Sequence, residues 1–330
     1  MLFQSLIRVS KFLVEGIVYK STGSWYSVKG ENGCFYECRI KGKFRIKDIR
    51  STNPIAVGDT VYFELEAVED KMQGIIVNIG KRRNYIIRKS VNLSKQVHII
   101  AANLDQAFLL VTLNHPITYT NFIDRFLITA EAYDIPAVLL FNKMDRYTPE
   151  EMKQMEGLIQ LYRKIGYQTI TISAKKGENV DQVKQLMTGK TNIFSGNSGV
   201  GKSTLINTLE PHLKLKTTEL SEQHLQGQHT TTFAEMYDLS FNARIIDTPG
   251  IRGFGVVEMR KEEIGDYFPE FFKLKTLCKF HNCLHVDEPK CAVKKGLENN
   301  AIALSRYQSY LQLLEEDANE SYRIDVHKLR

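Results

Sequence analysis

Short apolar runs separated by turn residues occupy the first quarter of the chain. The runs cover residues 16–20, 25–28, 34–40, 60–64 and 74–79, with glycine, serine or asparagine between them. None continues with the 3.6-residue period of an amphipathic helix, so each run indicates a strand. About five short strands in one small segment predict a β-barrel, and we expect an OB-fold over residues 1–90.

From residue 91 onward, strand-like runs alternate with helical ones. The strand-like runs are 106–112, 136–141, 168–172, 191–195, 233–241 and 243–246. The helical segments are 119–133, 149–165, 179–187 and the residues that follow 204. This alternation predicts an α/β domain with a parallel sheet over residues 91–265. Open sheets of this kind bind ligands at the carboxyl ends of their strands, so the loops there carry the chemistry.

Composition narrows the class of protein. The 330 residues are 43% hydrophobic and 25% charged, and no apolar run approaches the roughly 18 residues of a membrane span. The first 14 residues are interrupted by polar side chains and lack a small-residue cleavage site, so they do not indicate a signal peptide. Five cysteines, an odd number, argue against a secreted disulfide framework. We therefore expect a cytoplasmic protein without a membrane partner.

The net charge of +6 is concentrated at the N-terminus, where residues 1–90 carry 16 Lys and Arg against 9 Asp and Glu. This excess indicates a polyanionic partner, although an ordinary mixed-charge surface is an equal alternative. Barrels of the expected type bind nucleic acid with basic and aromatic side chains. The candidates are Trp25, Tyr26, Phe35, Tyr36, Lys41, Lys43, Arg45, Lys47, Lys81, Arg82, Arg83, Arg88 and Lys89. Each aromatic, taken singly, is better explained by packing in the barrel core.

A glycine-rich sequence, G-N-S-G-V-G-K-S-T, lies between the run 191–195 and a helical segment. Strand, glycine-rich turn, Lys-Ser and helix are the context of a phosphate-binding P-loop; the alternative is a surface turn. The backbone N–H groups and the helix N-terminus would face the phosphates. Lys202 would reach the β- and γ-phosphates, and Ser203 would bind Mg²⁺. The predicted residues are Gly196, Asn197, Ser198, Gly199, Val200, Gly201, Lys202, Ser203 and Thr204.

Two further loops predict which nucleotide binds. They are Asn142, Lys143, Met144 and Asp145 after the run 136–141, and Ser173, Ala174 and Lys175 after the run 168–172. The Asp145 carboxylate can accept from guanine N1–H and the exocyclic amine, a donor pair that adenine lacks. Asn142 would tie the loop to its neighbours, the Lys143 stem would lie along the ring, and the Ala174 N–H would meet guanine O6. GTP is the predicted ligand.

The segment 213–229 is polar with little apolar period, and it indicates a mobile switch loop that runs into three threonines. Thr230 or Thr231 would close on Mg²⁺ when the γ-phosphate is present. The last strand ends at Asp247-Thr248-Pro249-Gly250. Asp247 would contact Mg²⁺ through water, and the Gly250 N–H would sense the γ-phosphate.

The order of these motifs is unusual. In an ordinary GTPase the P-loop comes first, whereas here the two guanine-reading loops precede it. This order predicts a circularly permuted GTPase domain, which is physically permissible because domain termini usually lie close together at the surface. One consequence is that the segment after Asp247 runs directly into the C-terminal region.

Three cysteines and a histidine follow with the spacing Cys-x4-Cys-x-His-x5-Cys. Cys278, Cys283, His285 and Cys291 would fill a tetrahedral Zn²⁺ shell with no open position, so the site should be structural. His281 is a competitor of His285 for this role, and thiols gathered by chance are the alternative.

The residues that follow the cysteines, 294–316, have a helical pattern. Its apolar stripe, which we expect to face the core, consists of Leu304, Tyr307, Tyr310, Leu311 and Leu314. We therefore predict a zinc-binding and helical domain over residues 266–330.

Together, the barrel, the permuted motif order, Gly-x-His-Thr-Thr-Thr at 227–232 and the zinc spacing resemble the ribosome small subunit-dependent GTPase A family. The resemblance covers nearly the whole chain. It implies a GTP hydrolase in late maturation of the small ribosomal subunit, with barrel and zinc domain contacting rRNA. It also implies one structural Zn²⁺ and Mg²⁺ with GTP, and we expect a monomer. Gln228 departs from the basic residue expected in many relatives, so no contact is carried over to it.

Ile251 occupies the position at which many GTPases place a water-orienting glutamine. Hydrolysis should therefore be slow in the isolated protein and faster once the small subunit orders the switches, as the resemblance also implies. We predict that His229 positions or polarises the water; the alternative is a surface histidine. Two other functions stay open: a GTP-regulated RNA-binding module in which hydrolysis is incidental, and a transport or signalling NTPase without an RNA partner.

Overall fold

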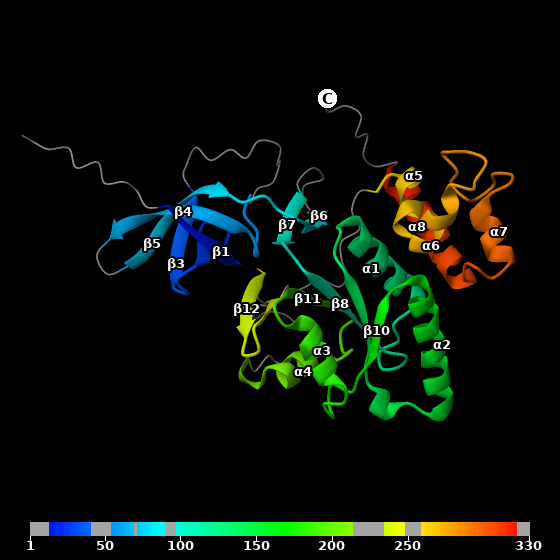
Figure 1. The fold of residues 1–330 in the computed structure, drawn as a ribbon, viewed down its shortest axis with the longest axis horizontal. Helices are drawn as coiled ribbons and strands as arrows, with labels where there is room; N and C mark the ends of the chain where they lie inside the picture. The colour runs from blue at the N-terminus through cyan, green and yellow to red at the C-terminus, as the bar shows by residue number, and fades with distance from the viewer. Residues whose placement is uncertain are drawn as a thin grey trace, which may run out of the picture.

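The computed structural model describes residues 13–40, 54–68, 71–89, 97–213, 234–247 and 259–321. A β-barrel, an α/β domain and a group of helices follow one another along the chain, and the barrel and the C-terminal helices flank the α/β domain (Figure 1). The predicted fold class is confirmed. The divisions at residues 90 and 265 stay predictions.

The N-terminal barrel is a closed five-stranded sheet. Its strands are β1 (Leu13–Ser21), β2 (Tyr26–Gly30), β3 (Phe35–Ile40), β4 (Thr60–Val68) and β5 (Lys71–Ile79). They pair in the order β1-β2-β3-β5-β4, and β4 returns to β1. The β3–β5 pair is parallel and the other pairs are antiparallel. Inward-facing residues such as Val18, Val28 and Phe63 form the buried core, as strand alternation requires.

A hairpin that the pattern did not predict follows the barrel. It consists of β6 (Tyr85–Lys89) and β7 (Val97–Ala102), which pair antiparallel as a separate two-stranded sheet. Val57 of the barrel bridges to Ala101, and the Asn84 side chain bonds to Leu104. The hairpin therefore connects the barrel to the α/β domain across the division predicted at residue 90.

The α/β domain contains a six-stranded sheet in the order β10-β9-β8-β11-β13-β12. The parallel strands are β8 (Gln106–Val111), β9 (Ala137–Phe141), β10 (Gln168–Thr171), β11 (Thr191–Ser195) and β13 (Ala243–Asp247). The remaining strand, β12 (Glu235–Leu239), is antiparallel to β13. Its outer edge pairs with β1 of the barrel, so the two domains share one continuous sheet.

Helices cover both faces of this sheet. One buried cluster contains residues of α1 (Thr120–Ala132) and α2 (Pro149–Ile165), and the other contains residues of α3 (Val180–Met187) and α4 (Lys202–Leu209). Short 3₁₀ turns lie at Met144–Arg146 and Pro211–Leu213. The start of α2 is fixed by a capping box between Thr148 and Glu151, which satisfies two otherwise unpaired N–H groups.

The C-terminal region contains α5 (Lys261–Ile264), a 3₁₀ turn (Gly265–Tyr267), α6 (Pro269–Lys275), α7 (Ala292–Glu298) and α8 (Leu304–Ser321). The prediction of a single helix over residues 294–316 is therefore wrong. The chain leaves α7 at Asn300, which has a left-handed φ of 59°, and the N–H groups of Ala301 and Ile302 return to Gly296 O.

The apolar stripe of α8 agrees with the prediction except at its first member. Tyr310 and Leu314 are buried, and Tyr307 and Leu311 pack partly against the same cluster. Leu304 is 58% exposed because it lies at the first turn of α8, where the helix has only begun. Within the described ranges, no helix is long and apolar enough to cross a membrane.

Candidate nucleotide site and metal centre

The glycine-rich loop connects β11 to α4 at the carboxyl edge of the sheet. Gly196, Gly199 and Gly201 all have positive φ, at 141°, 80° and 102°. A Cβ atom on Gly201 would lie 2.5 Å from Asn142 Nδ2, and one on Gly196 would lie 2.9 Å from Leu110 O. Only glycine fits at these two positions, because both the backbone angle and the neighbouring atoms exclude a side chain.

The Lys202 ammonium group closes the loop. It donates to Gly196 O and, over 3.1 Å, to Asn197 O. Burial lowers its pKa, and the nearby Asp247 partly opposes that shift. A partly buried cation among backbone carbonyls has a strong preference for an anion, so the group is suited to bind phosphate oxygens in their place.

Asn142 joins the three loops that the sequence predicted to read the nucleotide. It is 2% exposed, and its Nδ2 donates to Val200 O over 2.8 Å, while its Oδ1 accepts from Ala174 N over 3.0 Å. One side chain therefore fixes the phosphate loop and the Ser173–Lys175 loop relative to each other. The Ala174 N–H, predicted to meet guanine O6, is occupied by Asn142 in this structure.

Lys143 and Asp145 follow Asn142 in the same loop. Asp145 Oδ1 accepts from Ser173 Oγ over 2.6 Å, which leaves its second oxygen for a ligand and fixes its orientation. Lys143 has a left-handed backbone and donates to Gly199 O over 2.7 Å and to His115 O. Its stem thus spans from the guanine-reading loop to the phosphate loop, and burial lowers the pKa of its ammonium group.

Two contributors to the site were not predicted. The loop between β8 and α1 supplies His115 O to Lys143 and Ile117 O to the Asn197 side chain, the latter over 3.4 Å. Thr208 on α4 bonds to Ala174 O over 2.9 Å. The first could have been anticipated because the loop follows the carboxyl end of a strand, whereas Thr208 carries no sequence signal for this role.

The magnesium and switch predictions are only partly covered by the described residues. Ser203 is the second residue of α4, and Asp247 ends β13 next to the P-loop strand β11. Hydroxyl and carboxylate oxygens are ligands that Mg²⁺ prefers, so this pair fits the ion. His229, Thr230, Thr231 and Gly250, with Gln228 and Ile251, lie outside the described residues.

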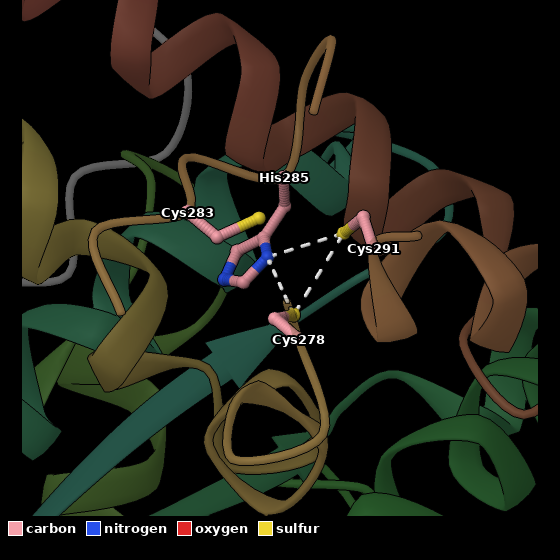
Figure 2. Close-up of side chains that lie close together, drawn as sticks. All are labelled: Cys278, Cys283, His285 and Cys291. Atoms are coloured by element: carbon pink, nitrogen blue, oxygen red, sulfur yellow. Dashed lines mark hydrogen bonds between the residues drawn. The ribbon is translucent and has the colours of Figure 1, made fainter. Parts of the chain in front are cut away.

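The three C-terminal cysteines and His285 converge (Figure 2). His285 Nδ1 lies 3.7 Å from Cys278 Sγ and 3.3 Å from Cys291 Sγ, and these two sulfurs are 4.0 Å apart. All four donor atoms, including Cys283 Sγ, lie within 4.8 Å of one another. Donors around a tetrahedral Zn²⁺ are about 3.5–3.8 Å apart, so the geometry and the donor set are those of a structural zinc site.

Backbone contacts hold this cluster in place. Cys291 caps α7, and its sulfur accepts from Lys294 N over 3.5 Å. Glu288 accepts from the N–H groups of Leu284 and Val286, on both sides of His285. His281 is exposed and is not part of the cluster, so the competition with His285 is resolved in favour of His285.

Burial lowers the pKa of His285 and raises the pKa of the Cys283 thiol to about 12. A metal must therefore displace thiol protons as it binds, which couples metal affinity to the folding of this region.

The barrel candidates for nucleic-acid binding separate into two groups. Tyr26 and Tyr36 are buried in the barrel core, whereas Trp25 and Phe35 are 40% and 48% exposed. Arg82 donates two hydrogen bonds of 2.6 Å to the buried Asp59 carboxylate, and Arg83 forms a salt bridge with Asp105.

Of the remaining basic candidates, Lys81 is exposed and the others are not placed. Lys41, Lys43, Arg45 and Lys47 lie outside the described residues, as do the side chains of Arg88 and Lys89. Trp25, Phe35 and Lys81 are therefore exposed candidates in the barrel region.

The sheet order, the phosphate loop and the two loops bound to it by Asn142 define a circularly permuted P-loop GTPase. The RsgA GTPase family model matches residues 79–257, and the RsgA N-terminal domain model matches residues 15–76. The chain therefore belongs to the RsgA GTPase family.

Individual relatives agree with this assignment. The chain is 66% identical to the small ribosomal subunit biogenesis GTPase RsgA of Christiangramia forsetii, covering 96% of this chain and 100% of the relative. It is 62% identical to that of Flavobacterium johnsoniae, covering 94% and 96%. The crystal structure of YjeQ from Thermotoga maritima has a TM-score of 0.75 at 34% identity, covering 93% and 99%. The crystal structure of YloQ, a circularly permuted GTPase, has a TM-score of 0.72 at 29% identity, and the match covers 94% of this chain and 96% of that chain.

Proposed function

We propose that this protein hydrolyses GTP during maturation of the small ribosomal subunit, as its relatives are named to do. The observation that carries the proposal is the Asn142 side chain, which joins the guanine-reading loops to the phosphate loop. That arrangement supports recognition of base and phosphates as one ligand. Cytoplasmic location and action as a monomer belong to the same proposal.

Guanine specificity rests on Asp145, which Ser173 orients. For Asp145→Asn we expect weaker GTP binding and a gain for xanthosine triphosphate, because the amide can donate to the oxygen that replaces the exocyclic amine. Fluorescent-nucleotide titration measures both affinities. The matched control, Asp181→Asn, changes a carboxylate in the first turn of α3 and should leave both affinities unchanged.

Hydrolysis needs Mg²⁺ and an ordered water. Ser203, Asp247 and Thr230 or Thr231 are the proposed ligands of Mg²⁺, which neutralises charge on the phosphates when bound. His229 is the proposed residue that positions the water, since Ile251 has no hydrogen-bonding side chain. If His229→Ala keeps full subunit-stimulated turnover with unchanged GTP affinity, this role is wrong.

The zinc region supports a contact with rRNA. Its outer surface carries exposed Phe272, Leu277 and Phe280. Lys275 lies over the Phe272 ring at 4.7 Å, and Lys279 lies over the Phe280 ring at 5.2 Å. Aromatic rings beside ammonium groups suit unpaired bases and phosphates together. Zn²⁺ bound by Cys278, Cys283, His285 and Cys291 would stabilise the fold that presents this surface.

One experiment separates the proposal from its alternatives: GTP turnover with and without purified small subunits, over a salt series. Stimulation by subunits supports the proposal. Nucleotide-dependent binding without stimulation would favour a GTP-regulated RNA-binding module. Absence of binding at low salt, where phosphate contacts are strongest, would overturn both.

A further inference from the structure

The hairpin of β12 and β13 lies between the two segments proposed to sense the γ-phosphate. Thr230 and Thr231 come shortly before β12, and Asp247 is the last residue of β13. Any nucleotide-dependent movement of these segments therefore acts on both ends of the hairpin. The bound nucleotide can therefore act most directly on the elements that the hairpin contacts.

The outer edge of this hairpin is attached to the barrel. Lys20 of β1 pairs with Glu235 of β12 in the sheet, and their side chains form a salt bridge of 3.4 Å. Tyr19 and Val57 of the barrel are buried in the same apolar cluster as Met236 and Ile246 of the hairpin. Backbone, charge and apolar contacts thus all connect the barrel to these two strands.

Asp238 on β12 is the centre of the polar contacts. It accepts from Tyr19 Oη over 2.6 Å and from Lys29 Nζ over 2.5 Å, and Arg244 of β13 lies 3.5 Å away. Tyr19 belongs to β1 and Lys29 to β2, so one carboxylate binds two barrel strands to the hairpin. Because Tyr19 is only 4% exposed, its hydroxyl has a fixed direction and Asp238 has a defined position relative to the barrel.

The C-terminal helices are attached elsewhere. Arg306 of α8 reaches Asp124 of α1 over 2.8 Å, and Gln312 accepts from Asn121 at the start of α1. Ile128 of α1 belongs to the buried cluster of the C-terminal region. The described contacts therefore place this region on α1, on the opposite side of the domain from β12.

We propose that the barrel changes its orientation with the bound nucleotide because β12 carries it, and that Asp238 is the positioning residue of this coupling. The inference rests on the proposed function only in assuming that the protein binds GTP and GDP. A movement of β12 relative to the rest of the sheet is transmitted to Tyr19 and Lys29 through Asp238. The C-terminal region keeps its position on α1.

The test measures two distances in the full-length protein by pulsed electron paramagnetic resonance. Spin labels on unnatural amino acids at exposed Glu31, in the barrel, and Lys153, on α2, leave the native cysteines untouched. We expect the Glu31–Lys153 distance distribution to differ between GDP and a non-hydrolysable GTP analogue. The Lys153–Glu298 distribution, which reports on the C-terminal region, should not change. Unchanged Glu31–Lys153 distances with both nucleotides bound would overturn the inference.

Variants then assign the coupling to Asp238. Asp238→Ala should make the Glu31–Lys153 distribution independent of nucleotide, and Tyr19→Phe should reduce the difference. The matched control is Glu66→Ala, which removes a salt bridge to Arg39 between two strands of the barrel. This variant should keep the wild-type difference between the GDP and GTP-analogue distance distributions. A full difference in Asp238→Ala would remove Asp238 from the coupling.

Nucleotide affinity is measured in the same samples. Coupling is reciprocal, so Asp238→Ala should also change the ratio of GDP to GTP-analogue affinity, by about fivefold or more. Failure of the protein to bind either nucleotide would overturn the proposed function together with this inference, whereas binding without a distance change overturns the inference alone.

Discussion

The barrel and the C-terminal region flank the same domain but are attached to it by ion pairs in opposite environments. Arg306 and Asp124 are 1% and 0% exposed, whereas the Lys29 and Asp238 side chains are 30% and 41% exposed. Glu270 and the face of the Phe268 ring complete the surroundings of Arg306. Breaking a buried pair leaves a charge without compensation, while an exposed pair exchanges its partner for water at little cost. The same chemistry therefore fixes one interface and leaves the other adjustable.

The largest effect is expected from removing the metal site. Cys291→Ser should lose stoichiometric zinc, and the helices after residue 259 should lose amide protection, because structural zinc contributes about 10–16 kcal/mol to such folds. Zinc analysis and hydrogen exchange measure both, and the barrel should stay protected. Cys34→Ser, a half-buried cysteine outside the cluster, is the control. Retained zinc in Cys291→Ser would contradict the assigned ligand.

Arg306→Met tests the buried interface. Asp124 and Glu270 would lose the guanidinium that both contact, and Asp124 already has one buried oxygen without a hydrogen-bond partner. We expect a loss of about 3–5 kcal/mol in the free energy of unfolding, measured by urea denaturation. Arg260→Met removes an exposed pair with Glu263 and should leave the free energy of unfolding nearly unchanged, because water replaces the lost partner. Equal losses in the two variants would contradict the contrast between buried and exposed pairs.

Gly201→Ala should perturb the nucleotide site without touching either interface. The new Cβ would displace Asn142 and break its bonds to Val200 and Ala174. Buried amide groups left unpaired cost about 1–3 kcal/mol, so GTP should bind about 5–150-fold more weakly in a fluorescent-nucleotide titration. Gly177→Ala, with a φ of 76° but open space around the Cβ, separates backbone strain from the steric clash. Similar affinity losses in both would argue against the Asn142 mechanism.

The smallest effect is expected at the exposed interface. Lys29→Met should change the free energy of unfolding by less than about 1 kcal/mol, because water replaces the lost partner of Asp238. Urea denaturation beside Arg306→Met gives the comparison directly. A loss as large as that of Arg306→Met would mean that the barrel interface is as firmly held as the C-terminal one.

Local sequence patterns were sufficient to predict most of the helices and strands. The barrel strands, the α/β alternation and α2 over Pro149–Ile165 agree with the structure, because each depends on the periodicity of neighbouring residues. The motif order alone indicated the permutation. The hairpin of β6 and β7 was missed, although its strands are as long as β2. The break before α8 was also missed, although Asn299 and Asn300 could have indicated it.

The sequence by itself determined the three loops that Asn142 joins and the four side chains that converge in the C-terminal region. Only the tertiary structure decided how the three parts are connected. Arg306 bonds to Asp124 across 182 residues, and Tyr19 bonds to Asp238 across 219. Such pairs leave no periodic signal, since each member is one polar residue whose partner is chosen by the packing of distant elements. Motifs are local in sequence because a loop of a few residues forms them, whereas interfaces depend on surfaces that exist only after the chain has folded.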